Sequence, residues 1–85
     1  MTEDKAYKEL QDKYNEEEER ALVCVRRMGY FSLIIAKKRD FDGTNYALEL
    51  LYNKRDSNTK MNHVRIVKAI DEQIDKVEAV IDGWG

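Results

Sequence analysis

Hydrophobic positions along the first part of the chain recur with alternating spacings of three and four residues. We call this series the heptad seam, and its nine positions are Tyr7, Leu10, Tyr14, Glu17, Ala21, Cys24, Met28, Phe31 and Ile35. Eight of the nine can be buried in a core, and Glu17 is the exception. This spacing is typical of a helix that pairs with another along a narrow stripe. The pattern predicts one long helix over residues 3–39.

The character of this predicted helix changes near residue 20. Before that point only the heptad seam is apolar. After it, further apolar residues widen the stripe nearly all round, namely Leu22, Val23, Val25, Tyr30, Leu33 and Ile34. A helix that is apolar on most sides is buried among other elements. We therefore expect the first half to be an exposed arm and the second half to be a core helix.

Turn-forming residues interrupt the pattern twice, at residues 40–45 and 56–59. The segment between them predicts a short helix over residues 44–54, which Asp42 or Thr44 would cap. A second amphipathic helix is predicted over residues 60–82. Its apolar stripe consists of His63, Val67, Ile70, Ile74, Val77, Ile81 and Trp84. The sequence thus predicts a single all-α domain over residues 1–85, a helical bundle.

Asp42 and Gly43 support one alternative fold, because this dipeptide is also a strong hairpin signal. With these two residues at the tip, Ile35 faces Leu50 and Leu33 faces Tyr52 on one apolar face of two strands. The chain would then be αββα. The uninterrupted heptad seam and the helix-forming ALELL run favour the all-helical interpretation.

The length of the first predicted helix bears on assembly. Its 37 residues would span about 55 Å, whereas a compact chain of this size has a radius of gyration of about 12 Å. Either the helix breaks near Gly29 or its first half projects. A projecting apolar stripe needs cover, from the C-terminal helix and from a second copy of the chain, so we expect a homodimer. The candidate dimer or partner interface is Tyr7, Leu10, Tyr14, Glu17, Ile74, Val77, Ile81 and Trp84.

The chain has no proline, in keeping with long helices, and its net charge is −2. This small net charge hides three blocks. Residues 1–19 hold eight acids and three bases, residues 20–68 hold eleven bases and four acids, and residues 69–85 hold five acids and one base. The surface is therefore expected to be polarised.

Three interpretations of the charge blocks compete. The acidic run could face a basic partner protein, and its residues are Glu16, Glu17, Glu18 and Glu19. The basic middle could contact nucleic acid, through Arg26, Arg27, Lys37, Lys38 and Arg39. Alternatively, the blocks neutralise one another within or between subunits. A sequence pI near 5.4 counts against a dedicated nucleic-acid binder.

Residues for catalysis are scarce, because the chain has one cysteine and one histidine. Cys24 lies in the heptad seam, where we expect it to be buried and unreactive. His63 lies at the predicted start of the last helix, and one Cys with one His does not make a zinc site. A calcium loop around Gly43 would put Lys38 at its first ligand position, where the positively charged side chain cannot coordinate a cation and would repel it. We expect no enzymatic activity, no cofactor and no metal.

No run of about 18 apolar residues occurs, and the start MTEDKAYKEL has no apolar signal core. We therefore expect a cytoplasmic protein without a membrane segment. The function expected is that of a small non-enzymatic protein that binds a partner protein and modulates or inhibits it, as small phage regulators do. The alternatives are a nucleic-acid-binding regulator that uses the basic middle, and a structural subunit.

Overall fold

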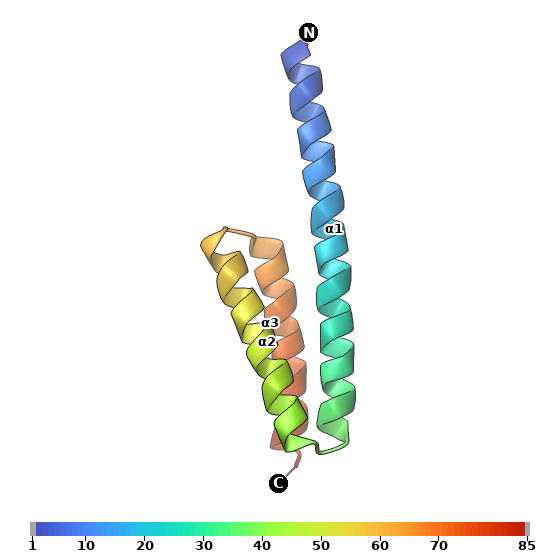
Figure 1. Ribbon diagram of the computed structural model, residues 1–85, viewed down its shortest axis with the longest axis vertical. Helices are drawn as coiled ribbons and strands as arrows, with labels where there is room; N and C mark the ends of the chain where they lie inside the picture. The colour runs from blue at the N-terminus through green and yellow to red at the C-terminus, as the bar shows by residue number, and fades with distance from the viewer. Residues whose placement is uncertain (1, 85) are drawn as a thin grey trace.

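Three helices make up the described part of the chain (Figure 1). The computed structural model describes residues 2–84, with side chains from Lys5 onward. Helix α1 spans Thr2–Lys37, α2 spans Phe41–Lys60 and α3 spans Val64–Asp82. α2 runs antiparallel to both α1 and α3. No strand occurs in residues 2–84, so the all-α expectation is confirmed and the hairpin alternative is wrong.

The first turn explains why the Asp42–Gly43 signal does not produce a hairpin. Arg39 takes the left-handed conformation (φ 58°), and the Asp40 N–H donates to the Ile35 carbonyl at 3.3 Å, which ends α1. The Asp40 carboxylate then accepts the Gly43 N–H at 2.9 Å and caps α2. Gly43 is thus in the first helical turn, and neither Asp42 nor Thr44 is the cap.

The expected boundaries of the middle helix, 44–54, are too short, and residues 56–59 are not a break. Their polar side chains bond back to the same helix: Asn58 Nδ2 donates to the Lys54 carbonyl at 2.7 Å and Thr59 Oγ1 to the Arg55 carbonyl at 2.8 Å. The chain turns instead at residues 61–63, with Asn62 left-handed (φ 58°). α3 consequently begins at Val64 rather than residue 60, and α1 ends at Lys37 rather than residue 39.

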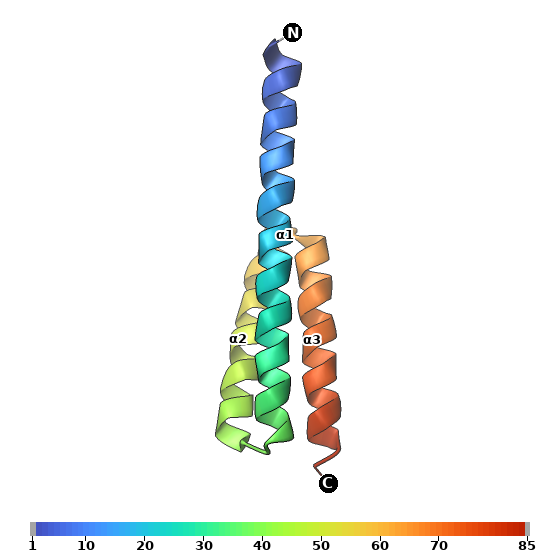
Figure 2. The same ribbon diagram turned by 90° about the vertical axis from the view of Figure 1, so that its right-hand side faces the viewer.

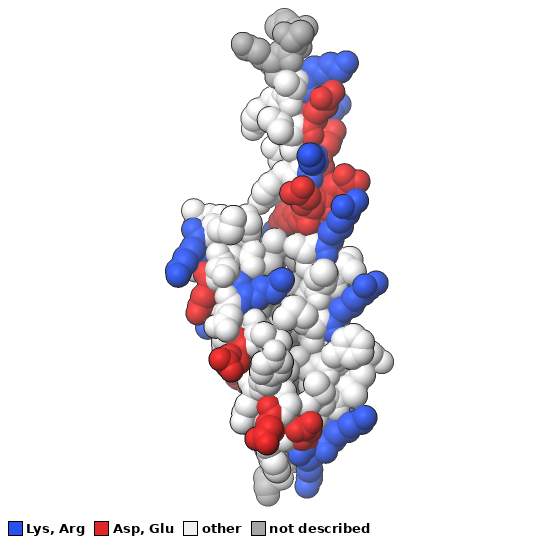
Figure 3. All heavy atoms as spheres, in the orientation of Figure 1, with Lys and Arg blue, Asp and Glu red and all other residues white. Residues whose placement is uncertain are grey.

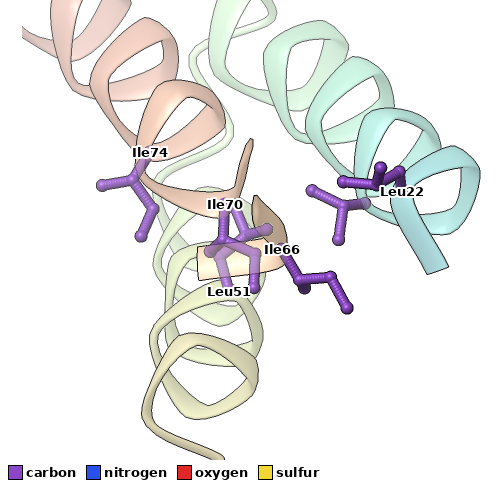
Figure 4. Packing of buried hydrophobic residues seen from close by; sticks show 6 residues of the cluster. Leu22, Leu51, Ile66, Ile70 and Ile74 are labelled. Atoms are coloured by element: carbon purple, nitrogen blue, oxygen red, sulfur yellow. The ribbon is translucent and has the colours of Figure 1, made fainter. Parts of the chain in front are cut away.

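The hydrophobic core lies where all three helices run side by side (Figure 4). α3 supplies three isoleucines at helical spacing, which pack against residues of α1 and α2. The buried cluster consists of Leu22, Val25, Leu51, Ile66, Ile70 and Ile74. Burying such side chains contributes about 1.5–3 kcal/mol each relative to exposing them, so this cluster is the main stabilising element of the bundle.

α1 continues without a break through Gly29, so the projecting alternative is the one observed (Figure 2). The molecule measures 62 × 20 × 16 Å, and the N-terminal part of α1 extends beyond the turn between α2 and α3. Gly29 is buried against α3, where a Cβ atom would overlap the side-chain amide of Gln73. The glycine therefore permits close packing of two helices instead of ending one of them.

Candidate protein-binding surface

The first sixteen residues of α1, residues 2–17, form the arm of the molecule. Every side chain from Lys5 to Glu17 is exposed, whereas buried residues recur on α1 from Leu22 onward. The arm therefore receives almost no cover from the described part of its own chain. In such a segment, apolar side chains are the ones that need an explanation.

Three apolar side chains of the heptad seam form a stripe along the arm. Tyr7 is 71% exposed, Leu10 68% and Tyr14 47%. Spacings of three and four residues put all three on one helical face. Only Tyr14 touches the bundle, with its ring centroid 6.2 Å from that of His63. His63 itself is half-buried at the N-cap of α3, where its Nδ1 lies 2.9 Å from Asn58 Oδ1.

Farther along α1 the heptad seam is not the buried stripe. The buried positions lie one residue later than the seam positions, and they are Leu22, Val25, Gly29, Ser32 and Ala36. Phe31 is 61% exposed, and Cys24 is exposed rather than buried as expected. Beyond the arm the seam is therefore only partly covered: Cys24 and Phe31 are exposed, whereas Ala21, Met28 and Ile35 are half-buried.

From residue 28 onward, small residues explain this displacement by one position. Gly29 lets α3 approach the backbone of α1 closely, and at Ala36 the Trp84 indole N–H donates to the backbone carbonyl at 2.8 Å. Ser32, between them, is also small and buried. In this part of α1, a pattern scored by hydrophobicity favours Met28, Phe31 and Ile35, each one position earlier. The sequence signal that was missed is a series of small residues at heptad spacing.

A groove of about 310 Å³ lies between α1 and α2, on the side of the heptad seam. Phe31 from α1 and Tyr46 and Leu50 from α2 are exposed around it. Its complete lining is Met28, Phe31, Ser32, Ile35, Gly43, Tyr46, Ala47 and Leu50. Tyr46 and Leu50 were not expected in an interface. The sequence showed that these two residues lie on one face of a helix, but not that this face borders a groove beside α1.

The C-terminal residues of the expected interface pack within the chain. Ile74 and Val77 are buried, and Ile81 and Trp84 are half-buried. Trp84 packs edge-to-face on Phe41, with ring centroids 4.8 Å apart, and closes the lower end of the bundle. These four side chains are therefore not brought together with Tyr7, Leu10 and Tyr14.

The acidic run lies where the arm leaves the bundle, as Figure 3 shows. Arg65 of α3 neutralises part of it, with ion pairs of 3.7 Å to Glu18 and 3.1 Å to Glu19. Among the described side chains, Glu16 and Glu17 form no ion pair. Internal neutralisation therefore accounts for two of the four carboxylates.

The basic residues of the expected nucleic-acid contact are all exposed but lie in two groups. Arg26 and Arg27 are in the middle of α1. Lys37, Lys38 and Arg39 lie at the turn between α1 and α2, about 15 Å farther along at 1.5 Å per residue. Residues 20–39 hold six bases and no acid, so the α1 edge of the bundle is basic (Figure 3).

Titratable groups offer little chemistry in the described residues. They include no group of three or more His, Cys, Asp or Glu side chains placed to hold a metal ion. Among these side chains, Tyr52 is the one with a shifted pKa, and its hydroxyl donates a hydrogen bond to the Glu78 carboxylate. This hydrogen bond, with a contribution from burial, raises the pKa of Tyr52 above its ordinary value. The contact ties α2 to α3 and is structural.

The chain matches no known family, no curated protein and no solved structure. None of the described helices is both long enough and apolar enough to cross a membrane.

Proposed function

We propose that this chain is a non-enzymatic, cytoplasmic protein that binds a partner protein and modulates or inhibits it, and that it does so as a homodimer. The exposed stripe of Tyr7, Leu10 and Tyr14 on the arm supports the proposal most directly. Tyrosine and other large apolar side chains dominate the energy of protein interfaces. A single cysteine fits a reducing compartment.

A matched pair of substitutions tests this role of the arm. Leu10 and Met61 are almost equally exposed, at 68% and 66%, but Met61 directly follows α2 and is not part of the stripe. With tagged chain as bait, Leu10→Gln should weaken capture of a partner protein by about tenfold or more, while Met61→Gln should leave it unchanged. Equal capture by both variants would contradict the proposal.

Nucleic-acid binding is the second candidate, favoured by the six bases and absent acids of residues 20–39. Such binding is electrostatic and weakens steeply with salt. A gel shift at low salt, repeated at higher salt, should detect it, and the double substitution Arg26→Gln with Arg27→Gln should reduce it. Absence of a shift at low salt would eliminate this candidate.

A further inference from the structure

The arm and the groove between α1 and α2 are complementary surfaces on one chain. Resting on the proposed role of the arm as a protein-binding surface, we propose that its occupant is a second copy of this chain. The two α1 helices pair antiparallel along the heptad seam. Each arm then lies in the groove of the other copy and completes its three helices to a four-helix bundle.

The arm cannot cover its own stripe, because α1 is one uninterrupted helix from Thr2 to Lys37. The dimensions fit a second copy. The 16 residues of the arm span about 24 Å, and the 20 residues of α2, which form one wall of the groove, span about 30 Å. α1 also packs less extensively on α2 than on α3, so this is the side on which a fourth helix can be added.

A two-fold axis level with residue 19 brings the apolar positions of the two copies together. Tyr7 and Phe31 each lie twelve positions from residue 19, and Leu10 and Met28 each lie nine positions from it. In an antiparallel pair, residues at equal distances from the axis lie side by side. Tyr7 and Leu10 of the arm then face Phe31 and Met28, which line the groove of the other copy.

Glu17 is the one seam position that does not suit an apolar contact, and the same alignment accommodates it. Glu17 is level with Ala21 of the other copy, whose small side chain leaves space for the carboxylate. Arg20 of that copy is the adjacent residue and supplies an opposite charge. The carboxylate therefore lies beside a guanidinium instead of a second carboxylate.

Charge distinguishes the antiparallel from the parallel arrangement. Residues 1–19 carry a net charge of −5, and residues 20–39 carry +6. Antiparallel pairing puts the acidic half of each α1 beside the basic half of the other. Parallel pairing would align two acidic segments and two basic segments, which repel. The proposed dimer should therefore weaken as salt is raised.

The native Cys24 and an introduced cysteine test the orientation. Tyr14 and Cys24 each lie five positions from residue 19, so antiparallel pairing brings a Cys at position 14 beside Cys24 of the other copy. Two Cys24 residues would be about 15 Å apart along the axis, too far for a disulfide. Under mild oxidation, Tyr14→Cys should give a covalent dimer of twice 10.0 kDa on a non-reducing gel.

Two controls complete this experiment. The unaltered chain, with Cys24 alone, and the double variant Tyr14→Cys with Cys24→Ser should both remain uncross-linked. Parallel pairing predicts the reverse, because identical positions would then face each other. Cross-linking of either control, or a dimer in which Tyr14→Cys fails to cross-link to Cys24, would overturn the proposal.

Sedimentation equilibrium tests the association itself. The chain should be dimeric at micromolar concentration, and Leu10→Gln should raise the dimer Kd by about tenfold or more, while Met61→Gln leaves it unchanged. Circular dichroism should show unchanged helix content in both variants, because both residues are exposed. A 10 kDa monomer at high micromolar concentration would overturn the proposal.

These results separate this inference from the proposed function. A monomeric chain that loses a partner protein on Leu10→Gln would overturn self-pairing and leave partner binding intact. A cross-linked dimer whose capture of a partner is unaffected by Leu10→Gln would support self-pairing and contradict the role proposed for the arm in partner binding.

Discussion

The two halves of α1 share one spacing of apolar residues, but the first half projects into solvent and the second half packs in the bundle. Along the arm, the heptad seam is the only apolar stripe, and every described side chain is exposed. Beyond residue 20 the helix carries two adjacent stripes, and from residue 28 onward the bundle buries the one with the smaller residues. In this half the seam is only partly covered, since Cys24 and Phe31 remain exposed. A heptad pattern therefore indicates that a helix face is suited to pairing, but not which neighbour it pairs with.

The largest expected difference in stability is between alanine substitutions at two leucines of α1. Leu22 is 4% exposed in the core cluster, and Leu10 is exposed on the arm. Leu22→Ala should lower the free energy of unfolding by about 2–5 kcal/mol because it leaves a cavity. Leu10→Ala should change it by less than about 0.5 kcal/mol at concentrations below the dimer Kd, where the chain is monomeric. Urea unfolding followed by circular dichroism measures both, and similar losses would contradict the division of α1 into two halves.

The close contact at Gly29 should give the next largest effect. Gly29→Ala improves helix propensity by about 1 kcal/mol, but its Cβ must displace the buried Gln73 amide. We expect a net loss of about 1 kcal/mol from this overpacking. In a Gln73→Ala background the same substitution should instead stabilise the protein by up to about 1 kcal/mol. If the sign of the change is the same in both backgrounds, the close approach of α1 and α3 is not what requires glycine.

A smaller effect is expected at the boundary between the two halves, where Arg65 pairs with Glu18 and Glu19. Arg65 is well exposed, so Arg65→Ala should cost about 0.2–1 kcal/mol, and less at high salt. Lys68→Ala, at an exposed position of the same helix, is the control and should have no effect. A salt-independent loss would indicate that Arg65 acts through packing of its aliphatic stem.

The smallest expected effect on stability concerns the contact between α2 and α3, in which α1 takes no part. The hydrogen bond to Glu78 raises the pKa of Tyr52, so the folded state holds this proton more tightly than the unfolded state. The stabilisation is complete below the ordinary tyrosine pKa of about 10 and is lost as pH rises above it. The stability difference between the unaltered chain and Tyr52→Phe should therefore shrink at alkaline pH. A constant difference from pH 7 to 11 would contradict this.

The position at which α2 ends shows where reasoning from local sequence fails. Asp56, Ser57, Asn58 and Thr59 have strong turn preferences, yet they lie inside α2. Their preference comes from side chains that bond to nearby backbone groups, and Asn58 and Thr59 make such bonds to helix carbonyls. Local preference is therefore overridden where the same hydrogen bonds can be made inside a helix that packs on a core.

The sequence predicted the part of the candidate surface that lies on the arm, but not which residues of the bundle remain available for an interface. Tyr7, Leu10 and Tyr14 are apolar residues in an otherwise charged segment, so their stripe is evident from spacing alone. Ile74, Val77 and Trp84 carry an equally regular pattern, but the bundle uses them internally. Periodicity identifies apolar faces without distinguishing those buried within one chain from those left for another.

The sequence by itself determined that this protein is helical, that its first helix is long and that its last helix is amphipathic, because these properties depend on residues within a few turns of one another. The tertiary structure decided which stripe of α1 is buried and where α2 ends. It also decided that Cys24 and Phe31 face outward. Those outcomes depend on how closely two helices can approach, and small residues such as Gly29 control that distance while contributing little to any hydrophobic pattern.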